Sequence, residues 1–342
     1  MAKVVTFGEI MLRLSPPGFE RFLQSPLLSA TFGGGEANVA VSLAHFGLDS
    51  QYVTALPQHA IGDAAIKALR AEGVRTDHVV RSGDRVGIYF AESGASQRAS
   101  AVIYDRAHSS ISAMKADAVD WNGVMSGADW FHVTGITPAL GTNGAEATLA
   151  AIAAACAAGV RVSVDLNYRK KLWTETRARE VMGPMMRNVD VVIANEEDLQ
   201  SVLGIHVEGT DVTRGQLNIE SFRHAAERVT RDFGPRMVAI TLRESVSASD
   251  NGWSAALWDA AGGTMHRSQR YDVRLVDRIG GGDSFAAGLI YGLVTGRKPE
   301  ASLRFAVAAS ALKQTIPGDF NRVTVDEVDR LAGGDASGRV QR

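Results

Sequence analysis

The clearest chemical signal in the chain is a run of three glycines followed by an aspartate, Gly280-Gly281-Gly282-Asp283, with an apolar segment of helical character directly after it. Glycines allow consecutive backbone N–H groups to point into one concavity. The start of a helix adds unsatisfied N–H groups and a partial positive charge. The run therefore predicts an anion site that can hold phosphate oxygens without a lysine.

Asp283 is the candidate reactive residue of this site. Beside an anion site, a carboxylate can take a proton from an incoming hydroxyl while the amides of Gly280, Gly281 and Gly282 hold a transferring phosphoryl group. The alternative is that Asp283 is an ordinary N-cap of the helix that follows. Both interpretations place Asp283 where a helix begins.

A second glycine cluster, Gly33-Gly34-Gly35, precedes another helical segment that carries Asn38 in its first turn. Tight packing of a helix against a strand would also explain these glycines. The chain contains no Gly-Lys dipeptide, which excludes a Walker A loop, and neither cluster spells G-x-G-x-x-G. A phosphate site in this protein must therefore be of another kind.

The composition narrows the class of protein. The 342 residues carry 36 Lys and Arg against 38 Asp and Glu, a formal charge of -2, so nucleic-acid binding is not expected. No apolar run approaches the ~18 residues of a membrane span, and Glu9 and Arg13 interrupt the N-terminus too early for a signal peptide. We expect a cytoplasmic protein. The single cysteine, Cys156, excludes a disulfide framework, and we expect it to be a buried helix residue.

Short β-branched runs alternate with helical segments, a pattern typical of a doubly wound α/β fold with a mainly parallel sheet. We expect strands at 4–7, 51–56, 130–135, 160–166, 189–195 and 237–242, and helices at 36–46, 146–158, 283–294 and 300–314.

Two segments break this rhythm, 12–32, which is rich in proline, and 85–111, in which apolar and polar residues alternate. They predict a small β-sheet that projects from the main one as a lid, or else a surface hairpin without function. We expect one domain over residues 1–332 and a disordered polar tail at 333–342.

Both glycine clusters resemble signatures of one family. GGGEANVAVSLAHFG (33–47) is similar to the N-terminal signature, and DRIGGGDSFAAG (277–288) to the C-terminal signature, of the ribokinase-like (PfkB-type) carbohydrate kinases. The likeness extends in element order from about Val4 to Arg330. Further segments resemble the subgroup that acts on 2-keto-3-deoxygluconate. They are GIYFAE (87–92), VIYDR (102–106), GITPAL (135–140), DLNYRKKLW (165–173) and ALKQTIPGDFN (311–321).

The resemblance implies a three-layer α/β core with a β-sheet lid, and ATP with Mg²⁺ as co-substrates. It also implies transfer of the γ-phosphate to 2-keto-3-deoxygluconate, giving the 6-phosphate. The site residues carried over are Asp283 as the base, Gly280, Gly281 and Gly282 as the anion hole, Gly34 and Asn38 at the sugar, Tyr89 and Tyr104 on the lid, and Arg106 and Arg169 at the substrate carboxylate.

The nucleotide and metal positions also come from the resemblance. It implies nucleotide contacts at Asn195, Thr241, Gly280 and Gly282. The family's N-x-x-E motif, linked to Mg²⁺, appears here as Asn195-Glu196-Glu197-Asp198, so Asp198 or Glu197 would act on the metal indirectly. The loop at 241–249 lacks the family's usual glycine. Asp277 and Ile279, with the later loop at 314–319, are candidates to hold a monovalent cation such as K⁺.

The chemistry of a carboxylate substrate agrees with this assignment, since guanidinium groups bind carboxylates in a two-pronged way. Many neutral-sugar kinases of the family carry an aspartate after the first strand. The corresponding place here, near Leu12 and Arg13, has no acid, which favours an anionic substrate. The alternatives are that Arg106 and Arg169 form surface ion pairs, and that the two tyrosines only pack.

Three other functions remain open at this level. The same fold could phosphorylate a neutral sugar such as fructose or ribose, or 2-keto-3-deoxygalactonate. It could also serve as a non-catalytic sugar-sensing module. The expected partners are a small sugar acid and ATP, and exposed lid strands predict a homo-oligomer formed through the lid, because an uncovered sheet edge favours pairing.

Overall fold

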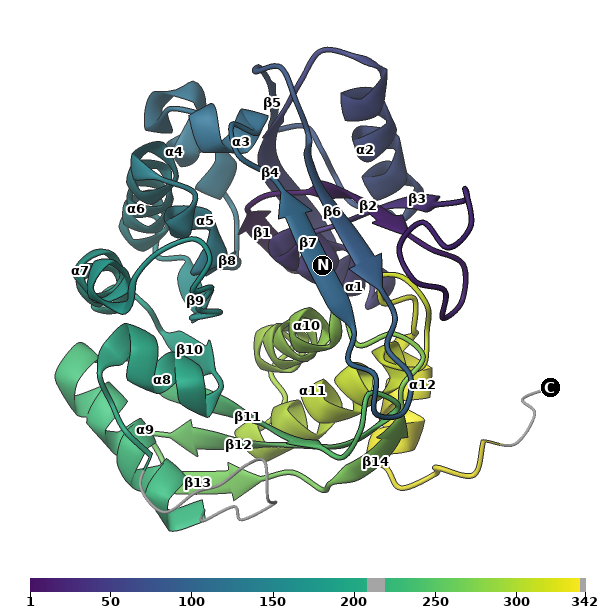
Figure 1. Cartoon of the computed structure of the whole chain (residues 1–342). Coiled ribbons are helices and arrows are strands. Elements are labelled where there is room, and N and C mark those ends of the chain that lie inside the picture. Colours follow the sequence, from purple (N-terminus) through teal and green to yellow (C-terminus); the bar gives the residue numbers. More distant parts are fainter. Residues whose placement is uncertain (208–218, 339–342) are drawn as a thin grey trace.

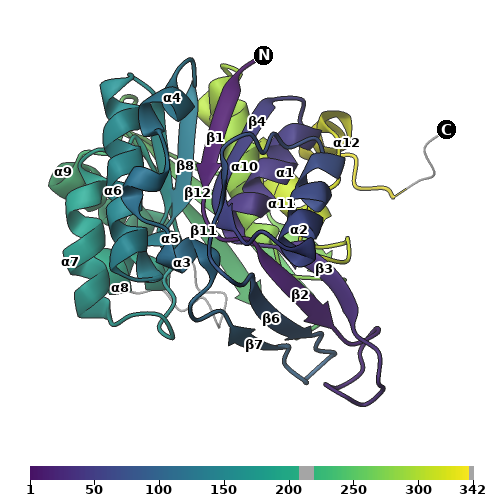
Figure 2. The ribbon, with the colours of Figure 1, turned by 90° about the horizontal axis from the view of Figure 1, so that it is seen from above.

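A mainly parallel sheet forms the centre of the molecule, with helices on both faces (Figures 1 and 2). The computed structural model describes residues 1–207 and 219–338. Within them the sheet has the strand order β13-β12-β11-β10-β9-β8-β1-β4-β5, and β14 pairs with β12. The strands are β1 Lys3–Phe7, β4 Asp49–Leu56, β5 Val79–Arg81, β8 Trp130–Thr134, β9 Arg161–Asp165, β10 Val191–Ala194, β11 Met237–Ser245, β12 Asp250–Asp259, β13 Thr264–Arg267 and β14 Tyr271–Arg274.

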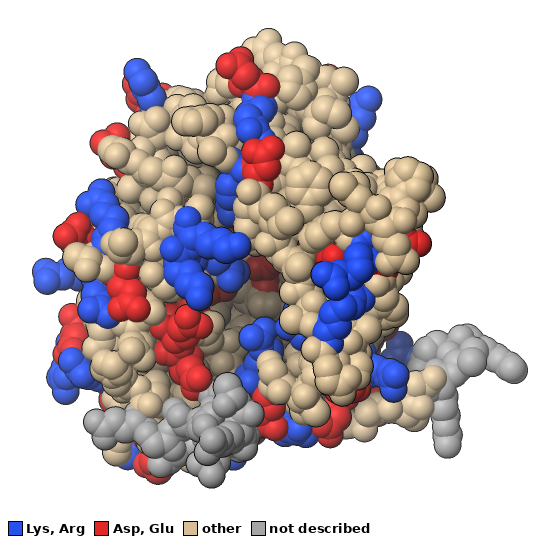
Figure 3. Space-filling model, viewed as in Figure 1, with Lys and Arg blue, Asp and Glu red and all other residues tan. Residues whose placement is uncertain are grey.

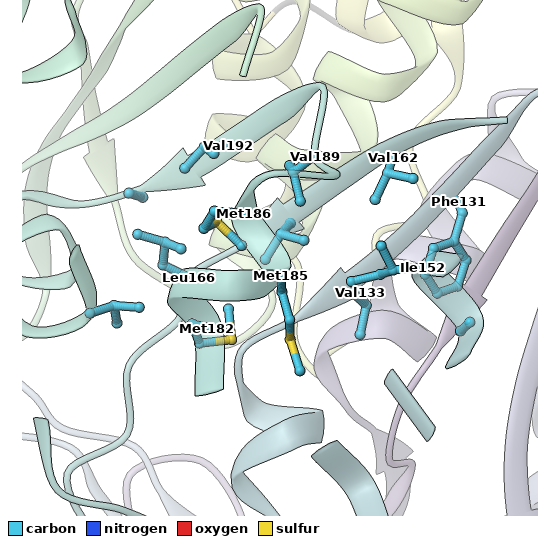
Figure 4. Packing of buried hydrophobic residues seen from close by; sticks show 14 of the residues in the cluster. Phe131, Val133, Ile152, Val162, Leu166, Met182, Met185, Met186, Val189 and Val192 are labelled. Atoms are coloured by element: carbon cyan, nitrogen blue, oxygen red, sulfur yellow. The ribbon is translucent and has the colours of Figure 1, made fainter. Parts of the chain in front are cut away.

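Successive side chains of the central strands point to opposite faces of the sheet, so the core has two layers. On β1, Val4 packs into the cluster on one face, whereas Val5 and Phe7 pack into the cluster on the other. This is the period of two that a strand covered on both sides requires. Figure 4 shows part of the second cluster, in which Phe131 and Met186 lie among the buried side chains.

The helices follow the same division. Figure 2 shows α6, α7 and α9 on one side of the sheet and α1, α2, α10 and α11 on the other. The helices are α1 Gly35–His45, α2 Ala60–Ala71, α3 Ser110–Ala113, α4 Trp121–Met125, α5 Ile136–Ala139, α6 Thr142–Ala157, α7 Glu175–Met186, α8 Glu196–Leu203, α9 Ile219–Phe233, α10 Gly281–Val294, α11 Pro299–Lys313 and α12 Val325–Ala332. No helix in the described ranges is both long and apolar enough to cross a bilayer.

The two irregular segments form a second, four-stranded sheet, as predicted. Its order is β3-β2-β6-β7, with β2 Met11–Ser15, β3 Ser29–Gly33, β6 Gly87–Glu92 and β7 Ala101–Asp105. Figure 2 shows these strands projecting from one edge of the core. Most of β7 is exposed. Pairing of this edge with a second copy of the chain stays a prediction.

The doubly wound fold is confirmed, but its antiparallel extension was not predicted. β11, β12 and β13 pair antiparallel at one end of the sheet. β12 starts with Asp-Asn-Gly, a sequence typical of turns, so the sequence does not predict a strand there. In the structure almost all of this strand is buried. Cys156 lies on α6 as expected, but it is exposed and not buried. Beyond α12, residues 333–338 form no helix or strand, and 339–342 lie outside the described residues.

Helix α10, which carries Asp283, is held in place by unusually close packing on α11. A Cβ added at Gly288 would lie 2.7 Å from the Cα of Ala306, a backbone atom that cannot move alone. The absence of a side chain at Gly288 therefore sets the approach of the two helices.

We predict that Gly288→Ala lowers the free energy of unfolding by about 1–3 kcal/mol, because the added methyl overpacks this contact. In an unobstructed helix interior the same change stabilises, since alanine is the better helix former. The sign of the change in urea-induced unfolding is therefore diagnostic. A variant as stable as the parent would show that the two helices separate without cost.

Candidate active site

A pocket of about 540 Å³ opens where the carboxyl ends of the parallel strands meet the lid. In Figure 3 it is the hollow whose rim carries acidic and basic side chains, with an acidic patch inside. This is the edge at which open α/β sheets bind ligands. The predicted residues that line it are Gly34, Asn38, Tyr89, Tyr104, Arg106, Arg169, Asn195, Glu197, Asp198, Thr241, Ile279, Gly280, Gly281, Gly282 and Asp283.

The glycine turn forms the start of α10. Gly280 is the N-cap residue with φ +83°, and a Cβ there would lie 2.2 Å from the carbonyl oxygen of Asp319, so both conformation and space require glycine. The amide of Gly281 donates to the carbonyl of Arg278 at 3.3 Å. The amides of Gly282 and Asp283 have no acceptor within the described residues. These amides are available to an anion.

Asp283 faces the pocket and does not cap its helix, so the N-cap alternative is wrong. Its Oδ2 accepts a hydrogen bond from Asn38 Nδ2 at 2.7 Å. Burial raises the pKa of Asp283 to about 6, against the opposing effect of the Asn38 hydrogen bond. A carboxylate of raised pKa that is still ionised at neutral pH meets the requirement for a general base.

Asn38 and Tyr89 are held in a buried hydrogen-bond network. Asn38 Nδ2 also lies 3.4 Å from Asp319 Oδ2, and Asn38 Oδ1 accepts from the amide of Gly34 at 3.2 Å. The Tyr89 hydroxyl donates to Asp319 Oδ1 at 2.6 Å, and Arg13 Nη1 donates to the same oxygen at 2.7 Å. The network thus positions the Asp283 carboxylate and the inner lid. Direct contact of Asn38 or Tyr89 with a sugar stays a prediction.

On the lid, Tyr89 and Tyr104 stand opposite each other on β6 and β7, and their rings stack 6.0 Å apart. Tyr104 is 43% exposed and Tyr89 is buried, and both line the pocket. The guanidinium of Arg106 lies 5.4 Å from the centre of the Tyr104 ring, a cation–π distance. Contact of Tyr104 with a substrate stays a prediction.

Glu9 corrects one inference from the sequence. No acid stands at Leu12 or Arg13, but Glu9 lies two residues beyond β1, buried, and Arg106 Nε donates to its Oε2 at 2.8 Å. The argument from a missing acid to an anionic substrate therefore loses its basis. Arg106 is bound to Glu9 as well as exposed to the pocket, so Arg169 is the better candidate for a substrate carboxylate.

Three arginines line the pocket alongside several carboxylates, so the pocket carries charges of both signs. The guanidinium groups of Arg169, Arg243 and Arg278 have no hydrogen-bond or ion-pair partner among the residues that the structure describes. Desolvation and then the neighbouring charges of Arg278 and Arg169 lower the pKa of Arg243. Guanidinium groups that face a cavity without a direct ion pair can bind an anionic ligand.

Sequence reasoning missed Arg243 and Arg278. The signal for Arg243 was its position two residues after Thr241 on one strand, which places both side chains on the same face. Arg278 lies between Asp277 and Ile279 in the turn before the glycines, a position that by itself does not indicate contact with a ligand.

The predicted metal positions are less open than expected. Asp198 forms a capping box at the start of α8, and its oxygens accept from the amides of Asn195 at 3.1 Å and Tyr168 at 2.9 Å. Burial raises the pKa of the neighbouring Asp165 well above its usual range. No group of three or more potential metal-ligating side chains occurs in the described ranges. A metal role for Asp198 or Glu197 stays a prediction.

Asp277 lies behind the pocket wall and not in it. Its side chain accepts from Arg13 Nη2 at 2.6 Å and from the amide of Ile279 at 3.1 Å. Its carbonyl, one of the groups expected to hold K⁺, accepts instead from Lys313 Nζ at 3.3 Å.

A carboxylate beside helix-start amides that have no acceptor, in a pocket under a lid, is an arrangement suited to an enzyme that transfers a phosphoryl group to a hydroxyl. The chain matches the model of the pfkB family carbohydrate kinases over residues 1–322. It belongs to that family.

Individual relatives agree over nearly the full length. The crystal structure of 2-dehydro-3-deoxygluconokinase from Thermotoga maritima shares 51% identity and a TM-score of 0.94, covering 98% of this chain and all of its own. The 2-dehydro-3-deoxygalactonokinase of Haloferax volcanii is 34% identical over 98% of both chains. The 2-dehydro-3-deoxygluconokinase of Thermoproteus tenax is 28% identical over 93% of this chain and 90% of its own.

The pKa of Asp283 predicts the acid side of the pH profile. The base form is lost as pH falls through about 6, so kcat/KM, which reports the free enzyme, should fall there. Asn38→Ala removes a hydrogen bond that stabilises the carboxylate, so the fall should move to higher pH.

The control is Asn122→Ala, which changes an exposed asparagine on α4 and should leave the profile in place. A profile for Asn38→Ala that is unmoved, or displaced to lower pH, would contradict the assignment of this limb to Asp283.

Proposed function

We propose that the protein phosphorylates 2-keto-3-deoxygluconate (2-dehydro-3-deoxygluconate) with ATP, giving the 6-phosphate and ADP. The observation that carries this proposal is the Asp283 carboxylate, oriented by Asn38 beside the free amides of the α10 start and facing a pocket with three unpaired arginines. The 51% identity to a 2-dehydro-3-deoxygluconokinase over 98% of the chain supports the choice of acceptor.

In the proposed reaction, Asp283 accepts the proton of the terminal hydroxyl as the hydroxyl oxygen attacks the γ-phosphorus of ATP. The bond from phosphorus to the β–γ bridging oxygen breaks, and ADP leaves. The amides of Gly282 and Asp283 donate to the oxygens of the transferring group, where negative charge must be stabilised. These amides are fixed before the substrates bind, so little reorganisation is needed.

The acid end of the acceptor would bind at Arg169, whose guanidinium has no partner in the described part of the chain. Tyr104, exposed on the lid, would cover the carbon chain of the acceptor. Arg106 would present its remaining N–H groups while Glu9 holds its orientation. A two-pronged contact at Arg169 fixes the acid so that the opposite end reaches Asp283.

The nucleotide would bind along β10 and β11. Asn195 follows β10, and Thr241 lies in the middle of β11, of which residues 241–245 form part; both residues line the pocket. Arg243 and Arg278 would contact the phosphate chain and so compensate for the absence of glycine in 241–249. Glu197, exposed in the pocket, is the carboxylate that fits a role beside Mg²⁺, whereas both oxygens of Asp198 already accept amides. When bound, Mg²⁺ would neutralise phosphate charge.

A second acceptor is 2-keto-3-deoxygalactonate. The 34% identity to the Haloferax volcanii galactonokinase favours it, and the two acids differ only in the configuration at one hydroxyl. Neutral sugars fit the three unpaired arginines less well, and an intact Asn38–Asp283 pair would have no purpose in a module that only senses sugars.

We predict that Asp283→Asn lowers kcat by at least about 10²–10⁴-fold, the usual contribution of a general base, with little change in the KM for the sugar acid. Coupled ADP release, measured with both keto-deoxy acids, fructose and ribose as acceptors, tests this. The parent enzyme should prefer the two acids. Near-normal turnover by Asp283→Asn would remove this residue from the mechanism, and a preference for fructose or ribose would refute the acceptor class.

We expect Arg169 to bind the sugar acid and Arg243 to bind ATP. We predict that Arg169→Ala raises the KM for the keto acid at least tenfold with a small effect on that for ATP, and that Arg243→Ala does the reverse. A matched control is Arg228→Ala, an exposed arginine on α9 outside the pocket. If both pocket variants raised the same KM, the proposed division of the pocket would be wrong.

A further inference from the structure

A lysine is buried directly behind the glycine turn. Lys313, the last residue of α11, is 0% exposed, and its Nζ lies 3.3 Å from the carbonyl oxygen of Asp277, 3.3 Å from that of Ile316 and 2.6 Å from that of Gly318. Three acceptors match the three N–H donors of an ammonium group. The side chain therefore sits in a cage of backbone carbonyls, the kind of site that suits a cation.

The charges around this cage balance. Arg13 pairs with Asp277 and Asp319, both buried, and Lys313 supplies the second positive charge for the two carboxylates. Burial lowers the pKa of Lys313, and Asp277 and Asp319 oppose that shift. A further cation in this cage would add an unbalanced charge and compete with Nζ for the same oxygens.

The cage joins the two loops on which the anion site depends. The amides of Val276 and Asp277 donate to the carbonyl of Gln314 at 2.9 and 3.2 Å. A Cβ on Gly280 would lie 3.2 Å from Lys313 Cε, so the lysine chain packs against the turn itself. The positive charge of Lys313 also lowers the pKa of Asp283, after larger effects of burial and other neighbours. Lys313 is thus a positioning residue behind the catalytic turn.

We propose that the ammonium group of Lys313 takes the place of a bound monovalent cation, so that the kinase works without K⁺. This corrects the expectation that Asp277 and Ile279 hold K⁺, since the residues present do not fit that ion. As far as it concerns catalysis, the inference rests on the proposed function. The Lys313 ammonium group hydrogen-bonds to the carbonyls of the turn at Asp277 and of the loop at Ile316 and Gly318, and so holds the two together. Unlike a bound ion, it cannot dissociate.

The test compares the parent with Lys313→Ala and Lys313→Met. Alanine opens the carbonyl cage, whereas methionine fills it with an uncharged chain of similar length. ADP release is followed in tetramethylammonium chloride, with K⁺ or NH₄⁺ replacing that ion at constant ionic strength. We expect the parent rate to change less than twofold, and Lys313→Ala to lose at least tenfold in kcat and recover at least threefold with K⁺ or NH₄⁺. Lys313→Met should be impaired and not recover.

A second readout does not need turnover. The thermal midpoint of the full chain is measured in the same salts without substrate. The parent and the control Lys67→Ala, an exposed lysine on α2, should melt at the same temperature with or without K⁺, whereas Lys313→Ala should melt higher in K⁺. If no acceptor is phosphorylated, the proposed function fails and this measurement still decides the role of the cage.

Activation of the parent by K⁺, or a parent midpoint that rises specifically with K⁺, would overturn the inference. It would also fall if Lys313→Ala kept the parent's kcat, or folded but responded to K⁺ in neither readout. A Lys313→Ala variant that folds only in K⁺ would support it.

Discussion

The hydrogen bond between Asn38 and Asp283 is the contact on which the site depends. It joins the first turn of α1 to the first turn of α10, two helices 245 residues apart in sequence. Both helices begin with glycines because close backbone approaches at these places leave no room for a Cβ. A Cβ added at Gly34, for example, would lie 2.0 Å from the carbonyl oxygen of Glu9. Two positively polarised helix ends thus converge on one carboxylate. The proposed base and the proposed anion site therefore arise from the same arrangement.

Charged side chains occur in two different settings, behind the pocket wall and in the pocket itself. Behind the pocket wall, Arg13, Lys313, Asp277 and Asp319 compensate one another and are almost completely buried. In the pocket, the guanidinium groups of Arg169, Arg243 and Arg278 form no ion pair within the described part of the chain, although carboxylates line the same cavity. Buried charges that are paired hold loops together, and unpaired charges in a cavity attract ligands. The structure contains both kinds within a few residues of each other.

The features that the sequence predicts are those that depend on residues close together in the chain. The glycine turns, the alternation of strands and helices, and the two lid segments all depend on neighbouring residues, and the fold and lid appear as expected. The partners of Arg13 could not be found in this way, since Asp277 lies 264 and Asp319 306 residues away. Lys313 gave a weak signal, a lysine within an otherwise apolar helix, ASALKQ. The turn signal at the start of β12 pointed away from a strand that long-range pairing creates.

The ties at the base of the lid limit how that sheet can move. Tyr89 of β6 is fastened to Asp319, and Arg106, which follows β7, to Glu9. Bonds that involve an ionised group contribute roughly 1.5–3 kcal/mol each, so neither strand separates easily from the core at this level. If the lid sheet moves, its strands must therefore bend in their outer halves, beyond these two contacts. The inner ends then act as a rigid floor, and access is controlled from the tip.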